Sequence, residues 1–342
     1  MEYATLGRSG VQVSRLCLGM MSYGSPDWQK WVLPADAGEH FVRRALDSGI
    51  NFFDTADFYS YGESERVLGD AIAKLTSRHD VVVCTKVGLP MDGGVNGGGL
   101  SRKAIRSRVE DSLRRLRTDY VDIYLLHQPD PLTPVEETLD AMHELVREGK
   151  VLYAGASNYP AWAMAKLAYA SRYVHRSRWS VAQVQYNLCY REDERDLLPL
   201  CDAEGIGVMV YSPLARGWLA SAGPEDVSAM SGLELKRLET DRKAHSLYGN
   251  ETDTAVRACL AVLAAKRGIP MARLAMSWVL SRPTVTSLLC GVLQDNHLDE
   301  ALAALEVKLS AEEIAELDAA YRPQVLKDTG FGAVMQSGTK TN

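Results

Sequence analysis

The chain has 342 residues, of which 46% are hydrophobic and 24% are charged, and its formal net charge is −6. This length suits one large α/β barrel or two average domains. An acidic balance argues against nucleic acid as a partner, because phosphate binding leaves a basic footprint. No apolar run approaches the roughly 20 residues that span a bilayer. The first ten residues also lack the basic and apolar regions of a secretory signal, so we expect a cytoplasmic protein with no membrane contact.

Cysteine and histidine spacing gives no sign of a metal site. No C-x-x-C pair occurs, and the seven histidines show no ligand spacing, so we expect no metal. We expect the six cysteines to be buried, reduced thiols. They are Cys17, Cys84, Cys189, Cys201, Cys259 and Cys290.

Eight short apolar runs alternate with amphipathic helical patterns. The runs cover Leu16–Met20, Ile50–Asp54, Val81–Thr85, Val121–Leu126, Val151–Ala156, Val181–Tyr186, Gly207–Tyr211 and Val285–Cys290. The helical patterns cover Ala37–Ser48, Ser64–Leu75, Ser101–Leu116, Val135–Glu148, Pro160–Ser171, Glu194–Glu204 and a double stretch, Thr252–Leu280. Eight such units predict an α/β fold, a (β/α)₈ TIM barrel. A doubly wound open sheet is the alternative, but no dinucleotide fingerprint follows a strand.

Three segments lie outside these eight units. Residues 2–14 predict a β-hairpin, with Gly7 and Gly10 in its turn, that would plug the bottom of a barrel. Residues 212–250 form a connection long enough to be a functional lid. A helical extension follows the eighth unit. We see no linker, so we expect one domain over residues 1–342, with a core of about 5–321.

Polar residues end several of the predicted strands. In α/β barrels, active sites collect at these carboxyl ends. The residues are Asp54, Lys86, His127, Ser157, Asn158, Gln185 and Tyr211. Taken singly, a strand-end Asp is as often a helix cap, a lone His is usually structural and a lone Lys is usually solvated. Together with nearby Tyr59 they form an acid–base set that solubility does not require.

The set suits protonation of an oxygen while hydride arrives at its carbon. Free tyrosine has a pKa of about 10, and we expect the Lys86 ammonium to lower the pKa of Tyr59. Asp54 would hold Lys86 in place, and His127 would orient a substrate oxygen or relay a proton. Hydrolysis is disfavoured because no activated nucleophile is apparent.

Two other stretches are open to more than one interpretation. Met91–Ser101 is rich in glycine but lacks the ending of a phosphate-binding P-loop, so a flexible loop near the pocket is favoured. Trp28 and Trp31 follow the first strand, where they would either line the substrate pocket or pack within the loop.

Several motifs together resemble the aldo-keto reductases. They are "GINFFDTADFYSYGESERVLG", "VVVCTKVG", "GLSRKAIRSRVEDSLRRLRTDYVDIYLLHQPDP", "GKVLYAGASNY" and "IGVMVYSPLARG". The resemblance extends from about Thr5 to Tyr321 and is nearest to the bacterial branch that also resembles potassium-channel β subunits. It implies a (β/α)₈ barrel that binds extended NADPH without a Rossmann fold.

The resemblance also implies roles for individual residues. The catalytic tetrad falls on Asp54, Tyr59, Lys86 and His127, with Tyr59 and His127 also meeting the substrate. The expected cofactor contacts are Gly19, Met20, Asp54, Ser157, Asn158, Gln185, Tyr211, Ser212, Pro213, Leu214, Ala215, Arg216, Gly217, Gly291, Leu293, His297, Glu300 and Ala301. Among these, Tyr211 would stack on the nicotinamide ring, and residues 212–217 would meet the pyrophosphate.

One segment departs from the family pattern. Leu293, His297 and Ala301 stand where basic, hydroxyl or amide residues are usual, and no Lys or Arg occurs between Arg282 and Lys308. A 2′-phosphate needs charged donors. NADPH is still expected, with NADH as an alternative, unless the cluster Arg237, Arg242 and Lys243 of the long connection supplies the charge.

The sequence therefore predicts a reversible NAD(P)H-dependent reductase of aldehydes or ketones, with a small-molecule substrate and Tyr59 as the general acid. One alternative is a nucleotide-sensing binding subunit with residual reductase activity. Another is a reductase of keto-sugars or secondary metabolites.

Overall fold

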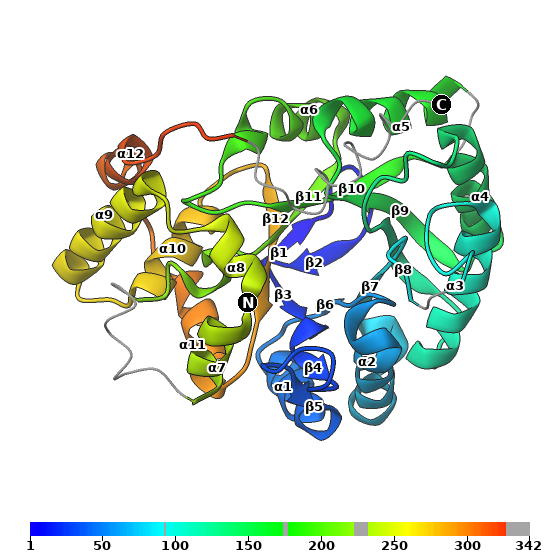
Figure 1. Cartoon of the computed structure of the whole chain (residues 1–342), viewed down its shortest axis with the longest axis horizontal. Helices are drawn as coiled ribbons and strands as arrows, with labels where there is room; N and C mark the ends of the chain where they lie inside the picture. Colours follow the sequence, from blue (N-terminus) through cyan, green and yellow to red (C-terminus); the bar gives the residue numbers. More distant parts are fainter. Residues whose placement is uncertain (92–93, 174–176, 222–231, 326–342) are drawn as a thin grey trace.

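The computed structural model describes residues 1–91, 94–173, 177–221 and 232–325 (Figure 1). Eight parallel strands close into a barrel in the order β10-β11-β12-β3-β6-β7-β8-β9. The strands are β3 (Leu16–Gly19), β6 (Phe52–Asp54), β7 (Val82–Val87), β8 (Val121–Leu126), β9 (Val151–Ser157), β10 (Trp179–Gln185), β11 (Gly207–Tyr211) and β12 (Val285–Gly291). The predicted (β/α)₈ barrel is confirmed, and the open sheet is wrong. Residues 326–342 lie outside the described part, so the single domain over 1–342 stays a prediction.

Helices surround the strands on the outside of the ring (Figure 1). They are α1 (Ala35–Asp47), α2 (Glu63–Leu75), α3 (Arg102–Leu116), α4 (Val135–Arg147), α5 (Ala161–Tyr173), α6 (Leu197–Glu204), α7 (Gly232–Thr240), α8 (Arg242–Leu247), α9 (Glu251–Arg267), α10 (Met271–Leu280), α11 (Asp295–Ala304) and α12 (Ala311–Ala319). Short 3₁₀ turns cover Met20–Ser22, Tyr59–Gly62, Arg78–Asp80, Glu192–Glu194 and Ala215–Gly217. The double helical pattern is the pair α9 and α10. No helix in the described ranges is both long and apolar enough to cross a membrane.

Local sequence signals explain where these helices begin and end. The Ser101 hydroxyl accepts a hydrogen bond from the backbone N–H of Ala104 and so caps α3. Gly49 and Gly149 follow α1 and α4 with φ of 82° and 74°, which is the left-handed region that glycine enters freely.

The N-terminal hairpin closes one end of the barrel. Strands β1 (Tyr3–Thr5) and β2 (Gln12–Ser14) pair in antiparallel fashion, and Leu6 and Val13 pack among side chains of the barrel interior. Gly7 has φ of 57°, and a Cβ there would lie 2.5 Å from the carbonyl oxygen of Gly205. Only glycine fits this approach to the start of β11. The hairpin therefore plugs the end where the strands begin, as predicted (Figure 1).

A buried polar contact joins the outer helices to the strand that carries Lys86. Glu65 of α2 is fully buried, and it accepts hydrogen bonds from Thr85 of β7 at 2.5 Å and from Arg115 of α3 at 2.6 Å. A buried carboxylate is tolerated when it is paired and hydrogen-bonded in this way. Glu65 thus fixes α2, α3 and β7 relative to one another.

Two connections carry structure of their own. The loop after β3 holds a small parallel sheet of β4 (Tyr23–Gly24) and β5 (Leu33–Pro34), which the sequence patterns did not indicate. The long connection 212–250 contains a 3₁₀ turn, α7 and α8, while its residues 222–231 lie outside the described part. Residues 92–93 of the glycine-rich loop also lie outside it.

Candidate active site

The expected acid–base residues meet at the carboxyl ends of neighbouring strands. Asp54 ends β6, and Lys86 lies near the end of the adjacent β7. The Lys86 ammonium donates to Asp54 Oδ2 at 2.7 Å, to the Thr55 carbonyl at 2.7 Å and to the Tyr59 hydroxyl at 3.3 Å. Because Lys86 has all three donors occupied, its position in the buried site is fixed.

The ion pair keeps Lys86 charged although no part of it reaches solvent. Burial opposes the charge of the ammonium, but the Asp54 carboxylate and Tyr59 outweigh burial and raise the pKa of Lys86. Asp54 is held from its other side by Gln183, whose side-chain amide donates to Oδ1 at 2.7 Å. Both oxygens of Asp54 therefore accept a hydrogen bond.

The geometry corrects the expected direction of the Tyr59 pKa. Lys86 favours the phenolate, but burial disfavours it more strongly, so the pKa of Tyr59 lies above its usual value. The sequence shows the nearby cation, but the desolvation of Tyr59 follows only from the packing around it. The Tyr59 hydroxyl therefore keeps its proton at neutral pH.

His127 follows β8 and faces Tyr59. The two rings lie 5.7 Å apart at 83°, an edge-to-face arrangement. Burial first, and then the charges of Lys86 and Lys243, lower the pKa of His127 well below its ordinary range. Its Nδ1 is buried and forms no hydrogen bond with any described residue. His127 is thus a neutral imidazole with an unused polar atom beside Tyr59.

A strained turn brings Tyr59 over the strand ends. Ser60 and Tyr61 have φ of 49° and 50°, and Gly62 follows with φ of 93°. Such left-handed residues reverse the chain sharply between β6 and α2, and strain of this kind concentrates at functional sites. The turn is anchored because Ser64 donates to the Met20 carbonyl at 2.8 Å.

The residues expected to contact nicotinamide lie at the same end of the barrel. Asn158 donates to the His127 carbonyl at 2.8 Å, and its Oδ1 accepts from the Tyr211 hydroxyl at 2.6 Å. Asn158 also contacts Ser157 Oγ at 3.2 Å, and Gln185 donates to the Tyr248 hydroxyl at 2.8 Å. Ser157, Asn158 and Tyr211 are thus joined by hydrogen bonds, whereas Gln185 bonds to Tyr248 of the long connection.

The loop after β11 has the backbone of an anion-binding turn. Ser212, Ala215 and Arg216 have φ of 54°, 49° and 56°, and Gly217 has φ of 103°. Successive residues in and out of the left-handed region form a concave row of N–H groups that suits phosphate oxygens. This fits the pyrophosphate contact expected of residues 212–217, with Pro213 and Leu214 inside the same turn. The Arg216 side chain is paired with Asp241, at 2.7 Å.

The segment after β12 divides into exposed and buried residues. Gly291 is exposed, whereas the side chains of Leu293 and Ala301 are buried and apolar. Glu300 binds Arg273 through two hydrogen bonds of 2.9 Å. His297 contacts Glu234 of α7 at 2.9 Å, so an acid of the long connection lies where a 2′-phosphate donor was expected.

The basic residues of the long connection, Arg237, Arg242 and Lys243, differ in their burial. Burial and the charge of Arg216 lower the pKa of Arg237 to about 10, and its guanidinium stacks on the Trp31 ring, 4.5 Å from the centroid. Arg242 and Lys243 are exposed on α8.

The remaining predicted residues lie at the end of β3 and in the loop after it. Gly19 pairs with Asp54 in register, and Met20 is fully buried beside it. Trp28 lies 6.1 Å from the Tyr59 ring and 5.8 Å from the Phe58 ring. Trp31 is only 2% exposed and packs with Val32 and Leu293, so packing describes it better than a pocket wall.

The sequence patterns did not single out Gln183, which holds Asp54 by a hydrogen bond. Gln183 and Gln185 lie two positions apart on β10 and therefore point to the same side of the strand. That period of two was the available signal.

The fold and this site define an oxidoreductase built on a (β/α)₈ barrel. The sequence model of the Aldo/keto reductase family matches residues 15–322, and the chain belongs to that family.

Curated relatives match over most of their length. The versiconal hemiacetal acetate reductase of Aspergillus parasiticus is 36% identical, with 95% of this chain and 98% of that protein covered. A protein of Schizosaccharomyces pombe named as an aryl-alcohol dehydrogenase is 36% identical, with 94% and 96% covered. The norsolorinic acid reductase of Aspergillus flavus is 34% identical, with 91% and 78% covered. These relatives are fungal, so the expected bacterial branch near the channel β subunits is not supported.

Proposed function

We propose that the chain is an NAD(P)H-dependent reductase that converts an aldehyde or ketone to an alcohol, reversibly, with Tyr59 as general acid. The observation that carries this proposal is the contact of the Tyr59 hydroxyl with Lys86, 3.3 Å away, while Lys86 is ion-paired with Asp54.

The side chains divide the work of moving one proton. A nicotinamide cofactor, when bound, supplies the hydride. Tyr59 holds the proton because burial keeps its pKa high. When that proton leaves for the substrate oxygen, the adjacent Lys86 stabilises the phenolate that remains, and neutral His127 can accept or donate a hydrogen bond at the same oxygen. This differential stabilisation lowers the barrier because the charge appears only as the proton moves.

For the cofactor we propose NADPH, from membership of the family, with weak discrimination against NADH. The left-handed turn 212–217 supports pyrophosphate binding. Weak discrimination is supported by the buried apolar Leu293 and Ala301 and by the carboxylate of Glu234 beside His297. Titration of the chain with NADPH and NADH, followed by tryptophan fluorescence, tests this. Affinities within tenfold support it, and a hundredfold preference for NADPH contradicts weak discrimination.

For the substrate we propose an aromatic aldehyde. The fungal relative named as an aryl-alcohol dehydrogenase supports this class. Trp28 lies 6.1 Å from the ring of Tyr59, the proposed proton donor, and 5.8 Å from the ring of Phe58. Flat aromatic side chains of this kind favour stacking with a planar substrate.

The deciding experiment compares wild type with Tyr59→Phe on a panel of aromatic and aliphatic aldehydes and keto-sugars. Loss of the general acid is expected to lower kcat about 10²- to 10⁴-fold. Cofactor affinity, measured separately by fluorescence, is expected to stay unchanged. If wild type and Tyr59→Phe reduce every carbonyl compound equally slowly while both bind the cofactor, the proposed reductase function is wrong. A nucleotide-sensing subunit is then favoured.

A further inference from the structure

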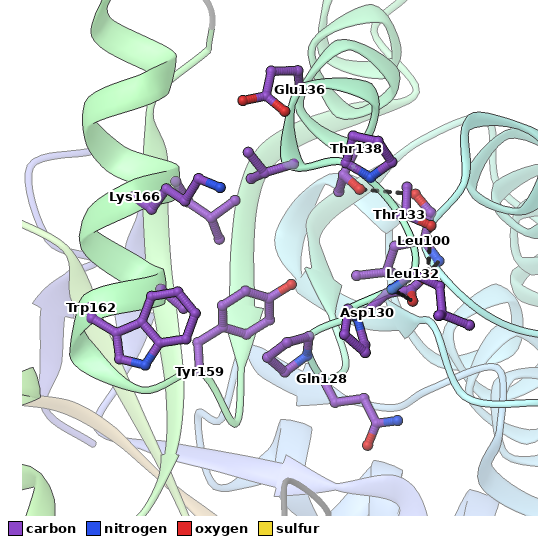
Figure 2. Close-up of a pocket in the computed structure, with 16 residues that line it drawn as sticks. Leu100, Gln128, Asp130, Leu132, Thr133, Glu136, Thr138, Tyr159, Trp162 and Lys166 are labelled. Atoms are coloured by element: carbon purple, nitrogen blue, oxygen red, sulfur yellow. Dashed lines mark hydrogen bonds between the residues drawn. The ribbon is translucent and has the colours of Figure 1, made fainter. Parts of the chain in front are cut away.

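A cavity lies at the carboxyl end of the barrel, outside the ring of strands. It has a volume of about 420 Å³, within the range of small-molecule sites. Its lining comes from the loop after β8, the first turn of α4, Tyr159 and the first half of α5 (Figure 2). None of the catalytic residues lines it, so it is separate from the site described above.

Two facing walls give the cavity its apolar character. Trp162 and Tyr159 form one wall, and Leu132 stands opposite (Figure 2). Pro129, Pro131 and Pro134 also line the cavity. Trp162 is 62% exposed and Leu132 is 91% exposed. Large apolar side chains that remain exposed around a hollow mark a place where a ligand gains by covering them. A flat aromatic wall favours stacking with a planar ring system.

The Leu132 wall is held rigidly. Asp130 accepts hydrogen bonds from the backbone N–H of Leu100 at 2.8 Å and of Leu132 at 2.9 Å, and from the Thr133 hydroxyl at 2.6 Å. These three hydrogen bonds to the Asp130 carboxylate fix the turn that carries Leu132. A preformed wall lowers the ordering cost of binding.

The free charge at the cavity is positive. Lys166 projects from α5 toward the space between the walls, whereas Glu136 lies at the outer rim (Figure 2). Lys166 forms no ion pair with another described residue, so its ammonium can meet an anionic group. The Tyr159 hydroxyl also points into the cavity (Figure 2). Burial and the Asp130 carboxylate raise the pKa of Tyr159, which keeps this hydroxyl a neutral hydrogen-bond donor.

We propose that this cavity binds a planar aromatic carboxylate, with the rings between Trp162 and Leu132 and the carboxylate on Lys166. The site is distinct from the reductase site, and the proposal does not depend on the proposed reaction. Gln128 and Tyr159, which line the cavity, directly follow His127 and Asn158 in the sequence.

Isothermal titration of the full chain with 1-naphthoate tests this, with neutral 1-naphthalenemethanol as the matched probe. Trp162→Ala is expected to raise the Kd for naphthoate about tenfold by removing the stacking wall. Lys166→Gln is expected to raise it about two- to fivefold, as fits an exposed ion pair, and to leave the Kd for the alcohol unchanged. Glu136→Gln, which removes a negative charge from the rim of the same cavity, is the control and is expected to leave the affinity equal or slightly higher.

All three side chains are exposed, so each variant is expected to keep the wild-type melting temperature and basal activity. The proposal is overturned if naphthoate does not bind at millimolar concentration, or if Trp162→Ala binds it like wild type. Equal wild-type affinity for the acid and the alcohol overturns the assignment of the carboxylate to Lys166.

Discussion

Gln183 donates a hydrogen bond to Asp54 across the inside of the barrel. Their strands, β10 and β6, are separated in the closed ring by β11, β12 and β3 on one side and by β7, β8 and β9 on the other. The two residues therefore come from opposite walls. The amide fixes the carboxylate that fixes Lys86, so the geometry at Tyr59 depends on a residue 129 positions away in the sequence.

Replacing Gln183 with Leu is expected to weaken both folding and catalysis. It removes the donor to a buried carboxylate oxygen, a loss worth about 1–3 kcal/mol of unfolding free energy. Urea unfolding measures the first effect, and kcat with a saturating aldehyde measures the second. Gln183→Asn is the control, because it keeps the amide on a side chain that is one methylene shorter. If Gln183→Leu has the same free energy of unfolding as wild type, the hydrogen bond across the barrel is dispensable for stability.

Asp57→Asn is expected to stabilise the protein at alkaline pH and to matter little near pH 4. Burial, followed by the charge of Glu65, raises the pKa of Asp57 from 3.8 to about 7. Between pH 4 and 7 the native state holds a proton that the unfolded chain has released. Stability contributed by this group is therefore full below about pH 4 and is lost as the pH rises through 7.

Asn imitates the protonated acid and carries no such dependence. Melting temperatures of the two proteins at pH 5 and pH 8 measure the difference, which is expected to be larger at pH 8. An equal difference at both values would mean that Asp57 does not change its protonation on unfolding.

Glu65→Ala is expected to be strongly destabilising, by about 3–5 kcal/mol, because it leaves Arg115 partly buried without its partner. Arg117→Ala serves as the matched control. Arg117 also pairs with an acid of α2, Asp70, but both side chains are more than half exposed, and its loss is expected to cost at most about 1 kcal/mol. Chemical denaturation separates the two cases. Equal costs would argue that burial does not set the strength of these pairs.

Glu234→Gln is expected to raise the affinity for NADPH relative to NADH by a few-fold. The carboxylate lies 2.9 Å from His297 Nε2, and a second negative charge arriving there would be repelled by it. Glu239→Gln provides the control, since Glu239 is exposed on the same helix. Fluorescence titration with both cofactors gives the ratio. An unchanged ratio would place the 2′-phosphate away from His297.

The strands could be predicted because each is a short apolar run between glycine, proline or polar residues, which is the pattern of a strand buried on both faces. Their boundaries moved by a few residues at most, as with β10, which begins at Trp179 and not Val181. Lys86, Asp54 and His127 could be found because polar residues stand out at the ends of such runs.

The sequence could not provide quantities that depend on how deeply a side chain is buried. The pKa of Tyr59 is decided by desolvation against the pull of Lys86, and only packing shows which is larger. Trp31 was a candidate for the pocket wall until its burial against Leu293 was known. Gln183 was hidden because it lies inside an apolar strand and its partner belongs to the opposite wall.

Leu6 and Gly7 of the N-terminal hairpin pack against the start of β11. The two ends of the barrel therefore differ in how much sequence change they tolerate. At the sealed end a backbone contact of 2.8 Å from Arg8 to Gly205 leaves little tolerance for change. At the open end the connections differ in length and carry the residues expected to choose substrate and cofactor. Insertions and substitutions above the strands can therefore redirect the enzyme toward new carbonyl compounds while its foundation stays the same.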